Sequence, residues 1–292
     1  MSREAKGTIR SEFAHVVRVF FRHKLGVVGL VMLIMFAGAA AFAPAVAPRD
    51  PYEMDLASPF LPPGSPGYIL GTDNYGRDIL SRLIYGSRIS LLIGIVVVSI
   101  ATVLGSVLGL FAGYYGRWVD NLVMRLVEVF YSFPFLILVI GVMAILGPSI
   151  FNVMLVLGLV SWPLYARLVR AQVIALKSED FIKAASALGC SDARIMFRHI
   201  LPNVLTPVIV SATLGIPGAI LSSASLGFLG FGVQPPTPEW GAMVSEAKDF
   251  ILLNSNMIIW PGMCIFLVVL SFNFVGDALR DALDPRLAKQ LN

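Results

Sequence analysis

Cysteine is almost absent from this sequence of 292 residues. Its two cysteines stand in unlike surroundings, Cys190 in a polar segment and Cys264 within an apolar run. Two thiols so placed make neither a disulfide framework nor a metal site. His199 has no His, Cys or Asp companion at metal-ligand spacing either. The sequence therefore predicts no metal site in this chain.

Charged residues are also scarce. They make up 14% of the chain, whereas hydrophobic residues make up 57%, and the mean hydropathy is +0.80. A soluble domain of this length cannot bury so much apolar surface, so most of it must face lipid or other buried helices. The net charge of +4 is small, and the basic residues lie between apolar runs. This distribution argues against a nucleic-acid partner.

A phosphate-binding loop is missing as well. The chain contains no Gly-x-x-x-x-Gly-Lys-Ser/Thr and no plausible catalytic constellation, so we expect neither ATP binding nor enzyme activity from it. No ionisable residue stands in the middle of an apolar run; Glu128 comes nearest, and we expect it to pair with Arg125. This pattern weighs against an ion-coupled transporter or channel, which stays a remote alternative.

Long apolar runs are what the sequence has in abundance. About 20 apolar residues in a helix cross a hydrocarbon core of about 30 Å. We therefore expect an all-α membrane protein with six transmembrane helices, over about 25–44, 89–112, 122–146, 151–172, 206–231 and 257–277. Gly105 and Gly109 are spaced for close helix packing. Ser222, Ser223 and Ser225 are expected to face protein.

The first apolar run has some features of a cleavable signal peptide. Ala41-Phe42-Ala43 resembles a signal-peptidase site, but the run is longer than the roughly 7–15 residues of a signal core. The polar lead before it is also long, and Pro44 would directly follow the cut. We expect an uncleaved signal-anchor helix, with cleavage as the alternative.

Lys and Arg fall mostly on one side of the expected spans. With the N-terminus inside, 17 of the 22 lie in cytoplasmic segments and five lie outside. By the positive-inside rule, both termini are cytoplasmic. The predicted segments are a cytoplasmic 1–24, a first helix with an external loop over 25–88, a core over 89–277 with a cytoplasmic loop 173–205, and a cytoplasmic tail 278–292.

The cytoplasmic loop begins with the pattern of a short helix. Ser178 can cap this helix, and Glu179 and Asp180 suit the positive end of its dipole. The expected apolar face of the helix comprises Phe181, Ala184, Ala185 and Leu188.

The rest of this loop predicts a reversal and a second helix. Gly189 supplies the turn, and Ser191 caps a second short helix running toward Leu201 and Pro202. A helix-turn-helix held under the membrane is built to dock into a groove on a cytosolic partner. Lys177, just before it, is expected to be exposed and without a role.

Two external segments carry further patterns. Thr72 or Asp73 can start an amphipathic helix on the external membrane surface, whose polar face holds Arg77, Asp78 and Arg82. Asp78 and Arg82, four residues apart, are expected to form a structural ion pair, with substrate or receptor contact as the alternative.

The second external segment is rich in proline. Three prolines within residues 235–238 forbid a continuing helix and make a stiff turn. Trp240 is placed to anchor at the membrane interface.

These motifs resemble those of a known family. Ala184–Gly189 and Ile200–Pro202 together resemble the EAA loop of ABC-importer permeases, although Lys183 stands where that motif has Glu and His199 where it has Ile. In the family this loop is the coupling helix that inserts into the ATPase subunit. The coupling residues implied here are Glu179, Asp180, Phe181, Ala184, Ala185, Leu188, Gly189, Leu201 and Pro202.

The external segments narrow the resemblance. Leu70–Leu91, Leu229–Gly241 and Asn273–Arg286 resemble the second, C-type subunit of dipeptide/oligopeptide permeases. The resemblance implies a type I importer (MetI-like) transmembrane domain in the bacterial inner membrane. It also implies a homologous second permease, an external substrate-binding protein and two cytosolic ATPase subunits that bind ATP and Mg. Peptides are the expected cargo; nickel, glutathione, opines or sugars in the same machinery are the alternative.

Overall fold

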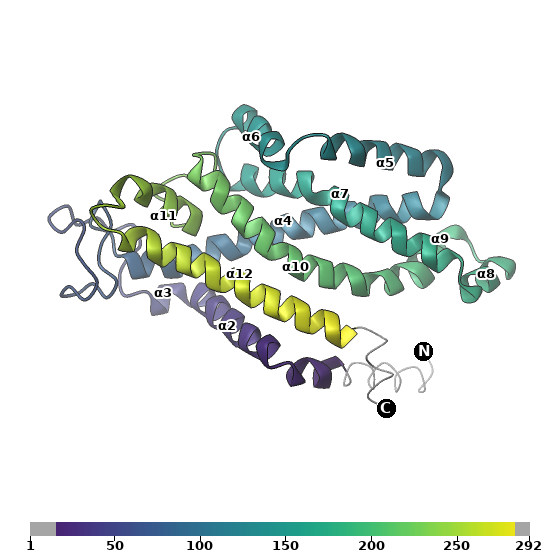
Figure 1. The fold of residues 1–292 in the computed structure, drawn as a ribbon, viewed down its shortest axis with the longest axis horizontal. Coiled ribbons are helices and arrows are strands. Elements are labelled where there is room, and N and C mark those ends of the chain that lie inside the picture. The colour runs from purple at the N-terminus through teal and green to yellow at the C-terminus, as the bar shows by residue number, and fades with distance from the viewer. Residues whose placement is uncertain (1–15, 284–292) are drawn as a thin grey trace.

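The computed structural model describes residues 16–283, and it is built from helices (Figure 1). The longer helices are α2 (Lys24–Ala41), α4 (Ile79–Tyr115), α5 (Arg117–Tyr131), α6 (Phe135–Leu146), α7 (Ile150–Lys177), α10 (Leu201–Phe228) and α12 (Asn256–Leu283). The shorter ones are α3 (Ala43–Val46), α8 (Asp180–Ala187), α9 (Asp192–Arg194), the π-helix η1 (Ile195–Ile200), α11 (Trp240–Ala247) and the 3-10 helix η2 (Lys248–Phe250). Within residues 16–283 no strand forms, which confirms the all-α prediction. Residues 1–15 and 284–292 of the predicted terminal segments lie outside this range.

Within the described part of the chain, five helical paths are long and apolar enough to cross a membrane: α2, α4, α7, α12 and the continuous path Asp192–Phe228. The remaining predicted span, the third, corresponds to the pair α5 and α6, which is bent by 88°. The segment 122–146 is therefore not one continuous helix. Pro134 has no N–H for the helical ladder and disfavours helical backbone at Phe133, so the chain bends between the two helices. With 12 residues, α6 is about 18 Å long.

Two spans begin earlier than predicted. Helix α4 starts at Ile79 rather than near residue 89, because the Asp78 carboxylate caps it by accepting the N–H of Ser81 at 2.8 Å. Helices α9, η1 and α10 follow one another without a break, so the helical path Asp192–Phe228 has 37 residues. The second helix of the cytoplasmic loop is therefore the beginning of the fifth span.

Helices α4 and α7 form the tightest contact of the bundle. A methyl group at Gly105 would lie 2.5 Å from the carbonyl oxygen of Trp162, and one at Gly109 would clash with the carbonyl of Ala166. The two glycines therefore let the backbones approach closely, as their spacing predicted. Helix α10 packs on both α4 and α7, whereas α12 packs mainly on α2 and α10.

The two ends of the molecule differ in character (Figure 1). One end carries α8 and α9, and the opposite end carries α11 and the loop 47–78. Helices α2 and α12 lie side by side, and His23 Nε2 is 3.9 Å from Asp281 Oδ2. The start of α2 and the end of α12 therefore meet on the side of α8, which the predicted orientation makes cytoplasmic.

Candidate functional site

The cytoplasmic loop 173–205 places α8 at one tip of the molecule (Figure 1). Ser178 does not cap α8, contrary to the prediction. Its hydroxyl donates to the carbonyl of Ala175 at 2.7 Å and so closes the end of α7. Glu179 occupies the cap position without a side-chain cap bond, and Asp180 stands in the first turn. A negative charge there stabilises the helix through its dipole.

Helix α8 has one buried and one exposed face. Ile182 and Ala185 are only 5% and 8% exposed and pack against the apolar cluster shared by α4, α7 and α10. Phe181 and Leu188 are 46% and 85% exposed, with the exposed Ala184 between them. Ala185 was predicted on one apolar face with Phe181, but the structure turns it toward this cluster, so it does not belong to the exposed face. We call Phe181, Ala184 and Leu188 the docking face.

Gly189 ends α8, as predicted. Its φ of +76° lies in the left-handed region, which costs other residues about 1 kcal/mol or more. The Gly189 N–H donates to the carbonyl of Ser186 at 3.0 Å, and the Cys190 N–H donates to that of Ala185 at 3.1 Å. This pair of bonds is the Schellman motif, which satisfies the last carbonyls of the helix. The turn behind the docking face is thus fixed by the backbone itself.

The chain after this turn leads directly into the membrane. Ser191 Oγ accepts the N–H of Arg194 at 3.4 Å, which confirms the predicted cap of α9. Leu201 is half-buried against the same apolar cluster. Pro202 is exposed in the first turn of α10 and has no N–H for the carbonyl of Arg198 four residues earlier. Both residues therefore lie inside a continuous helical path rather than at its end.

A group of contacts that sequence reasoning missed joins three helices beside the loop. The Tyr114 hydroxyl donates to Asp192 Oδ1 at 2.7 Å. Lys177 Nζ donates to the carbonyl of Tyr114 and lies 5.1 Å from the centre of its ring, so Lys177 does have a partner. We call these three residues the Tyr114 junction. Nearby, Arg170 holds Asp120 with two hydrogen bonds, one of them 2.6 Å long.

The Tyr114 junction ties together the end of α4, the end of α7 and the start of α9. Tyr114 and Asp192 stand 78 residues apart in the sequence, and no local pattern connects them. Their contact depends on the packing of α4 on α7, which brings the end of α4 close to the start of α9. The loop is therefore connected to the membrane helices by polar bonds as well as by apolar packing.

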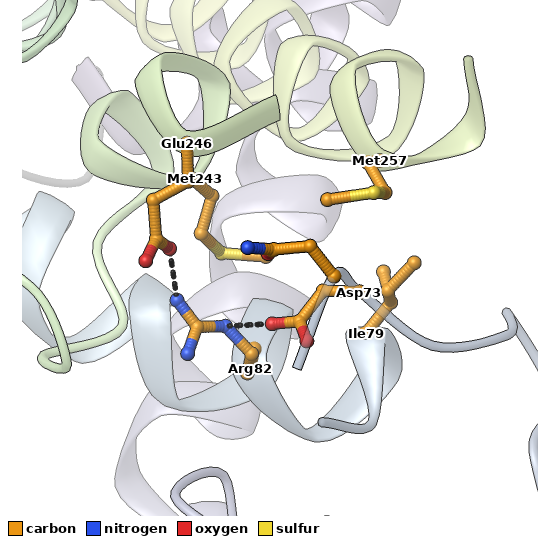
Figure 2. A pocket seen from close by; sticks show the side chains of 7 residues that line it. Asp73, Ile79, Arg82, Met243, Glu246 and Met257 are labelled. Atoms are coloured by element: carbon orange, nitrogen blue, oxygen red, sulfur yellow. Dashed lines mark hydrogen bonds and ion pairs between the residues drawn. The ribbon is translucent and has the colours of Figure 1, made fainter. Parts of the chain in front are cut away.

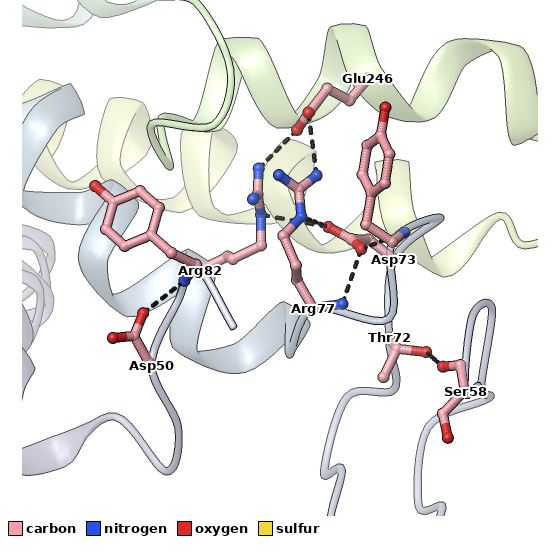
Figure 3. A network of polar contacts seen from close by, with 9 residues as sticks. Asp50, Ser58, Thr72, Asp73, Arg77, Arg82 and Glu246 are labelled. Carbon is pink, nitrogen blue, oxygen red and sulfur yellow. Dashed lines mark hydrogen bonds and ion pairs between the residues drawn. The ribbon is translucent and has the colours of Figure 1, made fainter. Parts of the chain in front are cut away.

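At the opposite end, four charged side chains form a buried group that we call the ion cluster (Figure 3). Arg77 Nε lies 2.6 Å from Asp73 Oδ2, and its Nη2 lies 3.1 Å from Glu246 Oε1. Arg82 Nη2 lies 2.6 Å from Glu246 Oε2, and its Nε lies 3.6 Å from Asp73 Oδ2. Both arginines are only 1% exposed. Two positive and two negative charges balance here, which buried charges require.

The ion cluster corrects the predictions for the first external segment. Asp78 does not pair with Arg82; it caps α4 instead. The charged residues do not lie on the membrane surface but are buried where α4 meets α11. The space beside Arg82 measures only about 10 Å³ (Figure 2), enough for about one water molecule. A space of that size supports the structural reading of these charges rather than substrate contact.

Trp240 also lies elsewhere than predicted. It is fully buried instead of anchoring at the membrane interface, and its Nε1 donates to the carbonyl of Leu83 at 3.1 Å. The ring of Phe36 packs edge-on against it, with centroids 5.7 Å apart. The neighbouring Glu239 caps α11 and accepts the hydroxyl of Ser90 at 3.0 Å. Together with the ion cluster, these contacts fasten α11 to α4.

Polar side chains in the spans follow their predictions in part. Arg125 and Glu128 form the expected pair, with Nη1 and Oε2 2.9 Å apart on an exposed surface. Ser223 is buried in protein and Ser222 is half-buried. Ser225, in contrast, is exposed, so only part of the serine prediction holds.

Comparison with known proteins identifies the family. The model of the family described as "Binding-protein-dependent transport system inner membrane component" matches residues 105–289. The chain belongs to this family. A second family model, "N-terminal TM domain of oligopeptide transport permease C", matches residues 11–63 of this permease.

Relatives of the permease cover nearly its whole length. A dipeptide transport system permease protein DppC of Alkalihalophilus pseudofirmus is 44% identical, over 97% of this chain and 93% of its own. A di/tripeptide DppC of Pseudomonas aeruginosa is 45% identical, over 91% and 90%. A glutathione transport system permease protein GsiD of Escherichia coli is 41% identical, over 96% and 92%. The permease is therefore a multi-pass inner-membrane component of an ABC importer.

Solved structures agree on the fold. A chain of the MetNI methionine ABC transporter, in an inward-facing conformation, aligns with a TM-score of 0.56 and 22% identity. The alignment covers 70% of this chain and 97% of that one. An amino acid ABC transporter aligns with a TM-score of 0.52, over 67% and 91%. At such identities the likeness concerns the fold alone, and it confirms the expected MetI-like arrangement.

The arrangement of this permease suits mechanical work. Across residues 16–283, no three His, Cys, Asp or Glu side chains come together as metal ligands. The notable features are an exposed apolar face before a fixed turn at one end and the buried ion cluster at the other. The first offers an apolar surface at the tip of the molecule, and the second keeps the external parts of α4 and α11 together.

Proposed function

We propose that this permease is the second membrane subunit of an ATP-driven importer of di- and oligopeptides. The observation that carries the proposal is the 44% identity, over nearly the whole chain, to a protein named as a dipeptide permease. This subunit forms half of the translocation path, and a homologous permease forms the other half. An external binding protein delivers the peptide. Two cytosolic ATPase subunits bind ATP and Mg, and this chain binds no cofactor.

Coupling to the ATPase runs through the docking face. Leu188 is largely exposed and Phe181 half-exposed, on a short helix at the cytoplasmic tip. An apolar helix face of this kind fits a hydrophobic groove on a partner. Closure of the ATPases on ATP then pushes α8, and the Tyr114 junction passes the displacement to α4 and α7. The membrane helices respond by alternating access.

Glutathione is the second candidate cargo. It is favoured by the relatives named as glutathione permeases, which are up to 41% identical over 96% of the chain. Glutathione is itself a small peptide, with a free amine and two free carboxylates. Dipeptides and glutathione would therefore need different binding proteins, whereas the same translocation path through the membrane could carry both.

Reconstitution of the four components tests the proposal. The permease, its partner permease, the ATPases and the binding protein are placed in liposomes, and uptake of labelled dialanine and glutathione is measured with and without ATP. We expect dialanine uptake that requires ATP and exceeds glutathione uptake. Preferred uptake of glutathione selects the second candidate. Uptake that ignores ATP but follows a proton gradient would rule out both.

A further inference from the structure

A cavity of about 250 Å³ lies within the membrane part of the permease, between α4, α6, α7 and α10. Val97 stands in the middle of α4 and Ser161 near the middle of α7, and both line the cavity. The cavity therefore lies between the two ends of the molecule, apart from both the docking face and the ion cluster. None of the features described so far makes use of it.

We propose that this cavity receives a side chain of the transported peptide and limits how large that side chain can be. The inference rests on the proposed function and deepens it, because it assigns a size-selective subsite to this subunit.

The chemistry of the wall fits an uncharged residue of a peptide. Its lining is mostly apolar, and among residues 16–283 no charged side chain contributes to it. A charged side chain in these surroundings would lose its hydration without a partner, so neutral and apolar side chains are favoured. The cavity therefore suits the side chains of residues such as leucine and phenylalanine.

Hydroxyl groups in the wall, from Ser161, Tyr165 and Ser222, favour a peptide over a lipid chain. Ser161 and Ser222 line the cavity, and within residues 16–283 neither makes a hydrogen bond. Ser225, one turn further along α10, instead donates to the carbonyl of Leu221 at 2.8 Å. A peptide offers amide groups to such hydroxyls beside its apolar side chain, whereas an acyl chain has no group that bonds to them.

Gly218 is a position at which a substitution can test the role of the cavity. A methyl group added at Gly218 would meet no atom within 4 Å, whereas one at Gly215 would clash with the Tyr165 hydroxyl. Both glycines line the cavity. Gly218 is exposed at the edge of the cavity, so a larger residue at position 218 narrows the cavity without displacing its wall.

The test compares Gly218→Leu with Gly262→Leu. Gly262 lies in α12, where an added methyl group also meets nothing within 4 Å, and it does not line the cavity. The complete complex is reconstituted, and uptake of dialanine, dileucine and diphenylalanine is measured with each peptide saturating the binding protein. That condition removes selection by the binding protein from the comparison.

We expect Gly218→Leu to lower diphenylalanine uptake about tenfold or more, since overpacking a filled site is costly, and to leave dialanine uptake within about twofold. Gly262→Leu should keep the wild-type profile. Equal effects on all three peptides, or none, would overturn the inference. So would a variant that is normally abundant in the membrane but no longer binds the second permease, because the cavity would then belong to the subunit interface.

Two further measurements keep the outcomes distinct. If Gly218→Leu does not accumulate in the membrane, Gly218→Ala decides, with a smaller loss expected for diphenylalanine alone. An unchanged profile for Gly218→Ala in that case overturns the inference. Absence of any peptide uptake by the wild-type complex counts against the proposed function itself, whereas a wild-type profile that Gly218 variants do not change counts only against the subsite.

Discussion

Arg77 and Arg82 are among the most buried side chains of the molecule, although arginine is rarely found inside a protein. They are tolerated because Asp73 and Glu246 neutralise them at hydrogen-bonding distances. The same contacts connect the loop before α4 to α11, which is more than 160 residues further along the chain. Replacing a single partner would leave a buried positive charge without compensation, which costs far more than the intact cluster contributes.

Glu246→Gln is expected to destabilise the external end. The change removes one of two negative charges and leaves both arginines with Asp73 alone, at a cost of about 3 kcal/mol. The midpoint of thermal unfolding of the purified complex should fall. Asp249→Asn, an exposed acid in η2 three residues after Glu246, is the matched control and should leave the midpoint unchanged. Equal midpoints for Glu246→Gln and the wild type would show that the cluster is not structural.

At the scale of elements, α8 depends on a turn that only glycine makes without strain. Gly189 ends the helix at a φ of +76°, and the docking face stands directly before it. The apolar surface on the inner side of α8 is small, with Ile182 and Ala185 as its buried residues. The direction of the docking face is therefore set mainly by the backbone of the turn.

Gly189→Arg should uncouple transport from ATP hydrolysis. A residue with a side chain costs about 1 kcal/mol or more in the left-handed conformation, so α8 shifts. We expect normal membrane abundance, normal binding of the second permease and severely reduced uptake. Residual ATPase activity should no longer respond to loaded binding protein. Ser186→Ala, an exposed position on the same helix, is the control. Wild-type uptake with coupled hydrolysis would refute the role given to this loop.

Tyr114→Phe tests the connection between the loop and the membrane helices. The change removes only the hydroxyl that bonds to Asp192, a contact worth about 1 kcal/mol in net terms. We expect weaker stimulation of the ATPase by loaded binding protein, with the complex intact. Tyr115→Phe, the exposed neighbour, should have no effect. In a double-mutant cycle, Asp192→Asn should add little once Tyr114 is changed. Fully additive effects would mean that the two residues act separately.

Local features of the elements could be predicted, and contacts between distant elements could not. Apolar runs indicated the spans, and the Gly189 turn followed from residue type, since each depends on neighbours in sequence. The face of α8 was assigned partly wrongly, because an alanine such as Ala185 fits either side of a helix. The ion cluster and the Tyr114 junction require residues from distant helices. In the sequence, the residues of the ion cluster have the pattern of surface charges, and Tyr114 is a tyrosine at the end of an apolar run.

At the scale of the whole molecule, the structure separates two chemically different ends. The docking face and the joined ends of α2 and α12 lie toward one end, and the loop 47–78 with α11 lies at the other. Basic residues are concentrated at the first end, as the positive-inside rule requires for the cytoplasmic side. Each long helix then has a defined direction across the membrane.

A reporter active only outside the cytoplasm tests this orientation. Fused after Asn292 it should be silent, and inserted near Pro62, an exposed position in the external loop, it should be active. A reporter active only in the cytoplasm should give the opposite pattern at the same two positions. If the first reporter is active when fused after Asn292, the orientation is the reverse of the one predicted, and the docking face lies outside the cytoplasm.

Helix α4 reaches further than a membrane requires. Its 37 residues span about 55 Å, against about 30 Å for the hydrocarbon core. The ion cluster ties its outer end to α11, and the Tyr114 junction ties its inner end to α7 and α9. A rigid tilt of about 5° about one end moves the other end by about 5 Å over that length. If the ATPases drive such a tilt from the inner end, as proposed, the outer end and the helix α11 bound to it move by about one helical turn.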